Sequence, residues 1–537
     1  MPDAAESATA SGQLKNLTDS TGQPLLKKIA RGIEKEGLRT TADGRLSTTP
    51  HPTTLGSALT NSWLTTDFSE SLLEFITPVC HSVEAALQHL ETAHAVAYRA
   101  LGDEVIWGAS MPCILPADSQ IPIAQYGQSN IAQMKTIYRR GLGHRYGRAM
   151  QTVAGIHYNF SLPMEFWQRA FDSDRSTEET KAETLQEYID QRYLGLIRNF
   201  RRHYWLLIYL FGAAPCADRS FIQGRPHQLQ SLGDNDIYLP FATSLRMGDL
   251  GYQSAAQREL FVCYNRLDTY IETLGKAIQQ PYPAYQNIAA PSDDGRQQLS
   301  SALLQIENEF YSPIRPKRVT HSGETPLHAL SQRGIEYIEV RCLDINPFAP
   351  LGINSETLRF LDAFLLYCLQ QPSPPCDRQE FQCINENQSR IVSSGRDKKL
   401  MLYCGKKQRP MRNCALQLLE GIAPIAALLD SGEPSAPHQS SCAVQRDKLL
   451  DTALTPSAKI LATMTARQQP YIAFGGQQST TFRQHFLSQR ADTALAQQLM
   501  QTAADSIDQQ RQIEQSDQVD FEQFLSDYFT AAKLEGQ

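Results

Sequence analysis

Residues 155–162 read Gly-Ile-His-Tyr-Asn-Phe-Ser-Leu, and this stretch decides the kind of fold that we expect. Successive side chains of a β-strand point to opposite faces, so a strand here has one apolar face and one polar face. The apolar face needs a core to cover it, while the polar face is left to line something else. The two faces carry, in turn, Ile156, Tyr158 and Phe160, and His157, Asn159 and Ser161.

Other strand-like segments place acidic side chains on one face in the same way. In the first and the last of them, the alternation puts both charged residues on the same side of the strand. In the middle one, Glu74 stands among apolar residues that would normally be buried. These segments and their charged residues are residues 32–36 with Glu34 and Glu36, residues 67–75 with Asp67 and Glu74, and residues 334–341 with Glu339 and Arg341.

Acids in such positions predict a metal site. An unpaired buried carboxylate costs several kcal/mol, so a group of them needs a cation or a hydrogen-bond network. Carboxylate-rich sites select Mg²⁺ or Mn²⁺ and tolerate one imidazole, here that of His157. Any one of these acids alone would more often form a surface salt bridge, and His157 alone would more often be a satisfied core histidine. Arg341 can either clamp a phosphoryl or carboxylate group or pair with Glu339.

Residues 314–318, Ile-Arg-Pro-Lys-Arg, form a compact basic segment that we interpret as a turn. Arg315, Lys317 and Arg318 would suit nucleotide phosphates, although a solvated turn is an equal alternative. The chain has no phosphate-binding P-loop, no dinucleotide fingerprint and no nucleophile elbow. A bound nucleotide would therefore be held by metal ions and arginines, and phosphoryl chemistry would use two or three ions.

Composition excludes several other classes of protein. The 537 residues carry 57 acidic and 50 basic side chains, a net charge of −7, which does not suit nucleic-acid binding. Apolar runs fall short of the ~20 residues that span a membrane, and the first residues do not resemble a secretion signal, so we expect a cytoplasmic protein. The 11 cysteines include no C-x-x-C pair and predict reduced thiols. Cys383 and Cys404 could pair on oxidation.

The chain is expected to consist of three parts. Residues 1–20 are small and polar and predict a loose arm. Residues 21–430 mix helices and strands and predict a catalytic α+β body. Residues 431–537 are rich in Gln and Ala with helical periodicity, so they predict a mostly helical region packed on that body.

Several strings of residues resemble bacterial glutamate–cysteine ligases, also called γ-glutamylcysteine synthetases, of the enterobacterial type. The resemblance is close from residue 26 to residue 348 and looser beyond. The strings are residues 32–36, 65–70, 73–78, 155–161, 243–247, 311–318 and 335–341.

The resemblance implies a fold and a reaction. The fold would be a curved, mostly antiparallel sheet that forms a funnel surrounded by helices, as in glutamine synthetase. The reaction would join the γ-carboxylate of L-glutamate to the amine of L-cysteine, with ATP converted to ADP, as the first step of glutathione biosynthesis. The resemblance also implies a monomer, and it suggests that glutathione acts as a feedback inhibitor.

The resemblance further implies roles for single residues. Arg341 would stabilise the transferred phosphoryl group, and Arg246 would hold the carboxylate of glutamate. The aromatic residues of the cysteine pocket could equally be wall packing. The implied metal ligands are Glu34, Glu36, Asp67, Glu74, His157 and Glu339, and the implied cysteine pocket is Phe68, Tyr138, Gln151, Tyr252 and Tyr311.

Three alternatives remain open on the sequence. Another glutamate or carboxylate ligase could use the same metal and ATP residues with a different amine acceptor. A metal-dependent phosphohydrolase could use the same acids to activate water. A non-catalytic module that binds metal or nucleotide is the third alternative, but it would be expected to lose its destabilising buried acids.

Overall fold

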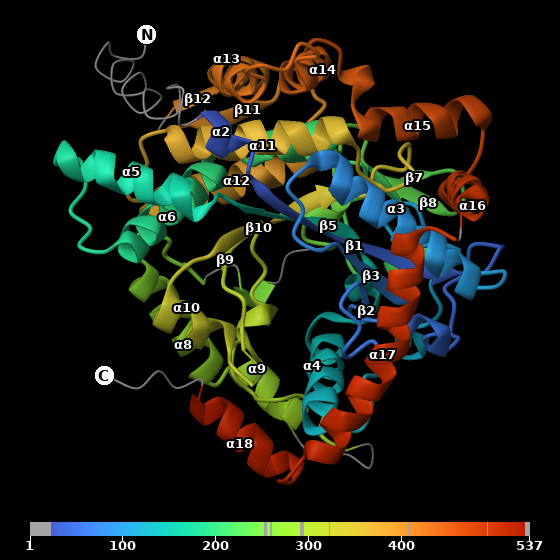
Figure 1. Ribbon diagram of the computed structural model, residues 1–537. Coiled ribbons are helices and arrows are strands. Elements are labelled where there is room, and N and C mark those ends of the chain that lie inside the picture. The colour runs from blue at the N-terminus through green and yellow to red at the C-terminus, as the bar shows by residue number, and fades with distance from the viewer. Residues whose placement is uncertain are drawn as a thin grey trace.

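A central antiparallel sheet organises the computed structural model, which describes residues 23–251, 255–257, 260–289, 295–321, 323–405, 407–490 and 492–531. Its strands follow the order β2-β3-β1-β5-β10-β9, with β4 (Val105–Ile106) paired to β1. Every named strand pairing in this sheet is antiparallel. Helices surround the sheet (Figure 1), so the predicted α+β class is confirmed. The strands on the main path are β1 Ala30–Thr40, β2 Leu64–Thr66, β3 Leu72–Ile76, β5 Gly155–Ser161, β9 Ile314–Lys317 and β10 Tyr337–Asp344.

The apolar face of the sheet is covered by helices. Ile156, Tyr158 and Phe160 of β5 are fully buried, as their alternation predicts. Each such side chain contributes about 1.5–3 kcal/mol through burial. The covering helices are α3 (Val83–Ala100), α6 (Leu185–His203), α7 (Trp205–Phe211) and α11 (Ser355–Gln370). With its apolar face closed in this way, only the other face of the sheet can line an open cavity.

A buried charge network ties the sheet to α11. The guanidinium of Arg31 donates to Asp362 Oδ2 at 2.6 Å, and the Tyr158 hydroxyl donates to Asp362 Oδ1 at 2.5 Å. Asp362 is fully buried, and its carboxylate would be costly without these donors. The network fixes β1 and β5 against the same helix, and these two strands carry much of the polar face.

The other helices surround the sheet and its polar face. Past residue 436 the described chain is helical apart from short connections. The proposed division into domains stays a prediction. The predicted arm at residues 1–20 lies outside the described residues. These helices are α2 Gln23–Leu26, α4 Asn130–Tyr146, α5 Met164–Ser176, α8 Leu267–Gln279, α9 Pro283–Gln286, α10 Pro326–Arg333, α12 Arg378–Ser394, α13 Met411–Leu429, α14 Pro437–Leu450, α15 Pro456–Arg467, α16 Tyr471–Ser488, α17 Ala494–Ser516 and α18 Phe521–Ala531.

Two small sheets complete the secondary structure. One contains β6 (Cys216–Asp218), β8 (Asp236–Tyr238) and β7 (Gln230–Leu232). The other is a hairpin of β11 (Met401–Cys404) and β12 (Lys407–Pro410). None of the helices in the described ranges is long and apolar enough to cross a membrane.

The cysteines differ from the prediction at one place. Cys404 forms a disulfide with Cys414, and Cys383 is free. The physical reason is that the β11–β12 hairpin folds the chain back, so that the first turn of α13 lies beside the end of β11. The other eight cysteines are also free, as expected for a chain of reduced thiols.

Lys35 lies on β1 between the acids at 34 and 36, but its side chain is directed to the apolar face. Lys35 is 3% exposed, and its Nζ lies 2.7 Å from His94 Nε2. His94 Nδ1 contacts the Leu90 carbonyl, so Nδ1 carries the proton and Nε2 accepts from Lys35. Burial lowers the pKa of Lys35 to about 7. The amine is therefore largely uncharged at alkaline pH.

Replacing Lys35 with Met is expected to flatten the pH dependence of stability. Between pH 7 and 10.5 the unfolded chain holds this proton and the folded chain does not, so wild-type stability rises with pH across this range. The full difference corresponds to at most about 5 kcal/mol, at about 1.4 kcal/mol for each tenfold change in proton affinity. Urea unfolding at several pH values measures it, with the exposed Lys399→Met as control. Parallel curves for wild type and K35M would contradict the prediction.

Candidate active site

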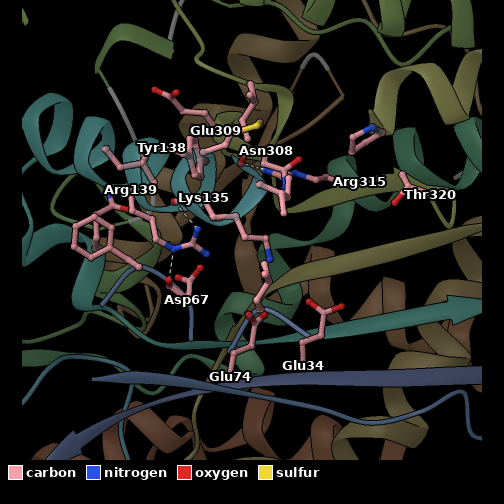
Figure 2. Close-up of a pocket in the computed structure, with 18 of the residues that line it drawn as sticks. Glu34, Asp67, Glu74, Lys135, Tyr138, Arg139, Asn308, Glu309, Arg315 and Thr320 are labelled. Atoms are coloured by element: carbon pink, nitrogen blue, oxygen red, sulfur yellow. Dashed lines mark hydrogen bonds between the residues drawn. The ribbon is translucent and has the colours of Figure 1, made fainter. Parts of the chain in front are cut away.

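A large cavity lies on the polar face of the central sheet. Its volume is about 1120 Å³, somewhat more than the ~300–1,000 Å³ of a typical pocket for one small molecule. Strands form its floor, and α4, the segment around Asn308, and the C-terminal helices form its walls. Figure 2 shows Glu34 and Glu74 rising from the strands towards residues of the opposite wall. The cavity is large enough for more than one substrate.

The register of the strands brings the predicted acids together on this floor. Glu34 of β1 pairs with His157 of β5, and Glu36 pairs with Glu74 of β3. These residues come from segments far apart in the sequence, and the side-chain alternation turns all of them to one face. The whole predicted ligand set lines the cavity, namely Glu34, Glu36, Asp67, Glu74, His157 and Glu339.

Hydrogen bonds orient these groups. His157 Nδ1 lies 3.1 Å from Glu34 Oε2, and Asn159 Nδ2 donates to Glu34 Oε1 at 2.8 Å. Potential ligand atoms of Glu34, Glu74 and His157 all lie within 4.8 Å of one another. That spacing allows a single ion to contact all three residues.

The charges of the cluster are unevenly compensated. Burial, together with the charges of Glu34, Asp67 and Glu36, raises the pKa of Glu74 well above its ordinary value. Burial also raises the pKa of Glu339, but Lys317 and Arg341 outweigh it and hold that pKa well below the usual range. Lys317 Nζ and Arg341 Nη1 donate to the two oxygens of Glu339 at 3.3 and 2.9 Å. The protein thus neutralises the β10 side of the floor and leaves excess negative charge on the β3 side.

The residues fit a divalent metal ion. His157 Nε2 is buried without a hydrogen-bond partner among the described residues, and Glu36 Oε1 lies 3.9 Å from it. Burial and the charge of Asp67 also raise the pKa of Glu36. A cation placed among these groups would bind the vacant imidazole nitrogen and offset the repulsion between the carboxylates. Glu34, Glu74 and His157 are the residues best placed to hold it.

Arg246 and Arg341 lie together at one side of the floor. Arg246 is 1% exposed, and its Nη2 donates to the Arg341 carbonyl at 3.1 Å. Asp344 Oδ1 lies 3.5 Å from Arg246 Nη1. Gly155 permits this arrangement, because a Cβ at that position would lie 1.8 Å from Arg246 Nη2. Both arginines line the cavity.

Most of the predicted cysteine pocket lines the same cavity. Gln151 Nε2 donates to the Tyr311 hydroxyl at 2.9 Å, so these two residues act as one polar pair. Phe68 and Tyr138 also line the cavity. Tyr252 lies outside the described residues.

The basic segment at 314–318 is a strand, not the turn that we predicted. Residues Ile314–Lys317 form β9 because they pair with β10 at the sheet edge. Alternation along the strand turns Arg315 and Lys317 into the cavity, but Arg318 lines a different pocket and lies 3.9 Å from Glu336. Arg315 Nη2 donates to the Asn308 carbonyl at 2.9 Å. Arg318 is therefore not placed with the other two.

Two cations on α4 were not predicted from the sequence. Lys135 and Arg139 are one helical turn apart and line the cavity, and Figure 2 shows both beside Tyr138. Burial and the neighbouring Arg139 lower the pKa of Lys135 to about 8. Arg139 Nε donates to the Asp67 carbonyl, which ties α4 to the turn before β3. The i, i+3, i+4 spacing of residues 135, 138 and 139 was the available signal.

Comparisons with known proteins agree with this geometry. A family model described as glutamate–cysteine ligase matches residues 14–391. A glutamate–cysteine ligase of Saccharophagus degradans is 50% identical over 516 residues, which cover 96% of each chain. One of Pseudomonas putida is 48% identical over 505 residues, 94% of this chain and 95% of that one.

Solved structures show the same relationship. A crystal structure of glutamate–cysteine ligase from Francisella tularensis in complex with AMP superposes with a TM-score of 0.87 at 34% identity, over 94% of this chain and 98% of that one. A bifunctional glutathione synthetase from Pasteurella multocida shares the fold, with a TM-score of 0.72 at 24% identity over 93% of this chain and 58% of that one. The chain belongs to the glutamate–cysteine ligase family.

Proposed function

We propose that this enzyme joins the γ-carboxylate of L-glutamate to the amine of L-cysteine, with ATP converted to ADP. The product is γ-glutamylcysteine, in the first step of glutathione biosynthesis. Membership of the glutamate–cysteine ligase family, with high identity over nearly the full chain, carries this conclusion. The cavity supports it, because acids, arginines and aromatic residues line one space that can hold ATP and two amino acids.

The acidic floor would hold two or three Mg²⁺ ions, and Mn²⁺ could replace them. The proposed ligands are the carboxylates of β1, β3 and β10 with Asp67 and the imidazole of His157. When bound, the ions would offset the negative charge of the ATP phosphates and of the glutamate carboxylate. The hydrogen bonds from Lys317 and Arg341 would keep the side-chain carboxylate of Glu339 ionised, so that it could bind a metal ion.

The arginines would position the reacting groups. Arg246 would bind the carboxylate of glutamate, and its near-complete burial would strengthen the charge-assisted hydrogen bonds. The γ-carboxylate would attack the γ-phosphorus of ATP and release ADP, which gives γ-glutamyl phosphate. Arg341 would stabilise the transferred phosphoryl group. Arg315 and Lys317 line the cavity near Glu339 and would contact ATP phosphates, whereas Arg318 would not.

The second half-reaction would occur on the side of the cavity that α4 lines. The amine of cysteine would attack the acyl carbon, and inorganic phosphate would leave. Phe68, Tyr138 and the Gln151–Tyr311 pair would receive the cysteine molecule, and Tyr252 is proposed to join them. A monomeric state, a cytoplasmic location and inhibition by glutathione complete the proposal.

A coupled assay of ADP release with mass detection of the product tests the function. Glutamate, cysteine, ATP and Mg²⁺ together should give one γ-glutamylcysteine for each ADP. Parallel reactions with 2-aminobutyrate or ammonia test for a different acceptor. Phosphate release without glutamate would instead indicate a phosphohydrolase, and no product with any amine would contradict the ligase assignment.

A further inference from the structure

The C-terminal helices form a wall of the cavity that holds the acidic cluster. Figure 1 shows α18 away from the central sheet, beyond the end of α4. The match to the family model ends at residue 391, so this wall comes from a part of the chain outside that match. The lining side chains from α17, α18 and the connection between them are Ile513, Ser516, Asp517, Phe524, Asp527 and Tyr528.

A small hydrophobic cluster, separate from the main core, holds α18 in this place. Leu525 is 4% exposed and packs with Met134 and Ile137 of α4. Phe524 and Tyr528 are half-buried, pack against the same cluster and also face the cavity. So small a cluster fixes the helix less firmly than the main core would, because stabilisation follows the apolar area buried.

Polar contacts fasten the connection between α17 and α18 to the start of α4. Asp517 Oδ2 accepts from the backbone N–H of Asn130 at 2.6 Å, and the Val519 carbonyl accepts from Asn130 Nδ2 at 2.9 Å. A carboxylate at a helix N-terminus is favourable, because the first N–H groups have no partner within the helix. The same helix carries Lys135 and Tyr138 into the cavity. The C-terminal segment therefore holds α4 in place as well as lining the cavity itself.

We propose that the C-terminal wall formed by α17, α18 and their connection couples ATP cleavage to dipeptide formation, with Phe524 and Tyr528 keeping bulk water from γ-glutamyl phosphate. The inference rests on the proposed function, since the acyl phosphate is its intermediate. Water that reached this intermediate would attack it and release glutamate and inorganic phosphate. The net reaction would then be ATP and water giving ADP and phosphate. A closed wall suppresses this side reaction because it excludes water from the reactive group.

The double substitution Phe524→Ala and Tyr528→Ala tests this proposal. We expect the ratio of ADP to γ-glutamylcysteine to rise from one in the wild type to about two or more, and the excess ADP to require glutamate. Met500→Ala is the matched control, because Met500 is a 48% exposed apolar residue on α17 outside the cavity lining. It should keep the ratio at one. Circular dichroism melting establishes that each variant is folded.

The outcomes separate the two claims. A folded double variant with an unchanged ratio of ADP to γ-glutamylcysteine would overturn the role of the C-terminal wall while leaving the ligase function intact. If the double variant does not fold, Tyr528→Leu is judged by the same ratio. A wild-type protein that makes no γ-glutamylcysteine would overturn the proposed function, and the inference about the C-terminal wall with it.

Discussion

Glu34→Gln is expected to lower kcat by about 10²–10³-fold, the range seen when one preorganised electrostatic group is removed from an active site. Glu34 lies at the centre of the floor, where His157 and Asn159 orient its two oxygens. Glutamine keeps the shape and one acceptor oxygen but loses the charge that attracts a divalent ion. The measurement is kcat with saturating ATP, glutamate and cysteine over a range of Mg²⁺ concentrations.

The control for this variant is Glu165→Gln. Glu165 is exposed on α5, where it pairs with Lys28 far from the acidic floor. We expect E165Q to retain wild-type turnover. Wild-type turnover in E34Q at every Mg²⁺ concentration would remove Glu34 from the proposed ligand set.

Glu74→Gln is expected to stabilise the metal-free protein while it lowers activity to a similar extent. The pKa of Glu74 is raised in the folded state, so the folded protein holds this proton more tightly than the unfolded chain. The stability of the wild type therefore falls as pH rises above 4.5, and the ionised group opposes folding above its folded-state pKa. Glutamine removes that repulsion. We expect the melting temperature in EDTA at pH 8 to rise by about 2 °C or more.

Added Mg²⁺ should reverse the order of stability. The ion binds the folded wild-type protein and stabilises it by mass action, whereas E74Q has lost a ligand and gains less. Melting curves of both proteins with EDTA and with Mg²⁺ measure the two differences. An E74Q variant that is less stable than wild type in EDTA would show that Glu74 is compensated by the protein alone.

Side-chain alternation predicted the acidic floor, because β-strands turn every second residue to one face whatever the rest of the fold does. The residues of β1, β5 and β10 thus lie on the faces that we expected. The turn predicted at residues 314–318 was wrong. Pairing with β10 at the sheet edge makes this segment a strand, and its basic residues do not reveal that pairing in the sequence.

The walls of the cavity were less predictable than its floor. The residues of α18 line the cavity and pack against α4, and packing between segments so far apart in sequence leaves no local pattern. The disulfide illustrates the same limit. Cys404 and Cys414 meet because a hairpin reverses the chain between them, whereas the polar, partly basic stretch between Cys383 and Cys404 had suggested that pair.

Anomalous diffraction from crystals soaked in Mn²⁺ tests most directly whether these acids bind divalent ions. Mn²⁺ prefers the same oxygen and imidazole ligands as Mg²⁺ and can be located without assuming its position. We predict a peak within about 2.5 Å of carboxylate oxygens of Glu34 and Glu74 and of a nitrogen of His157. Manganese found only at acids outside this cavity, with the floor empty, would contradict the metal-dependent mechanism.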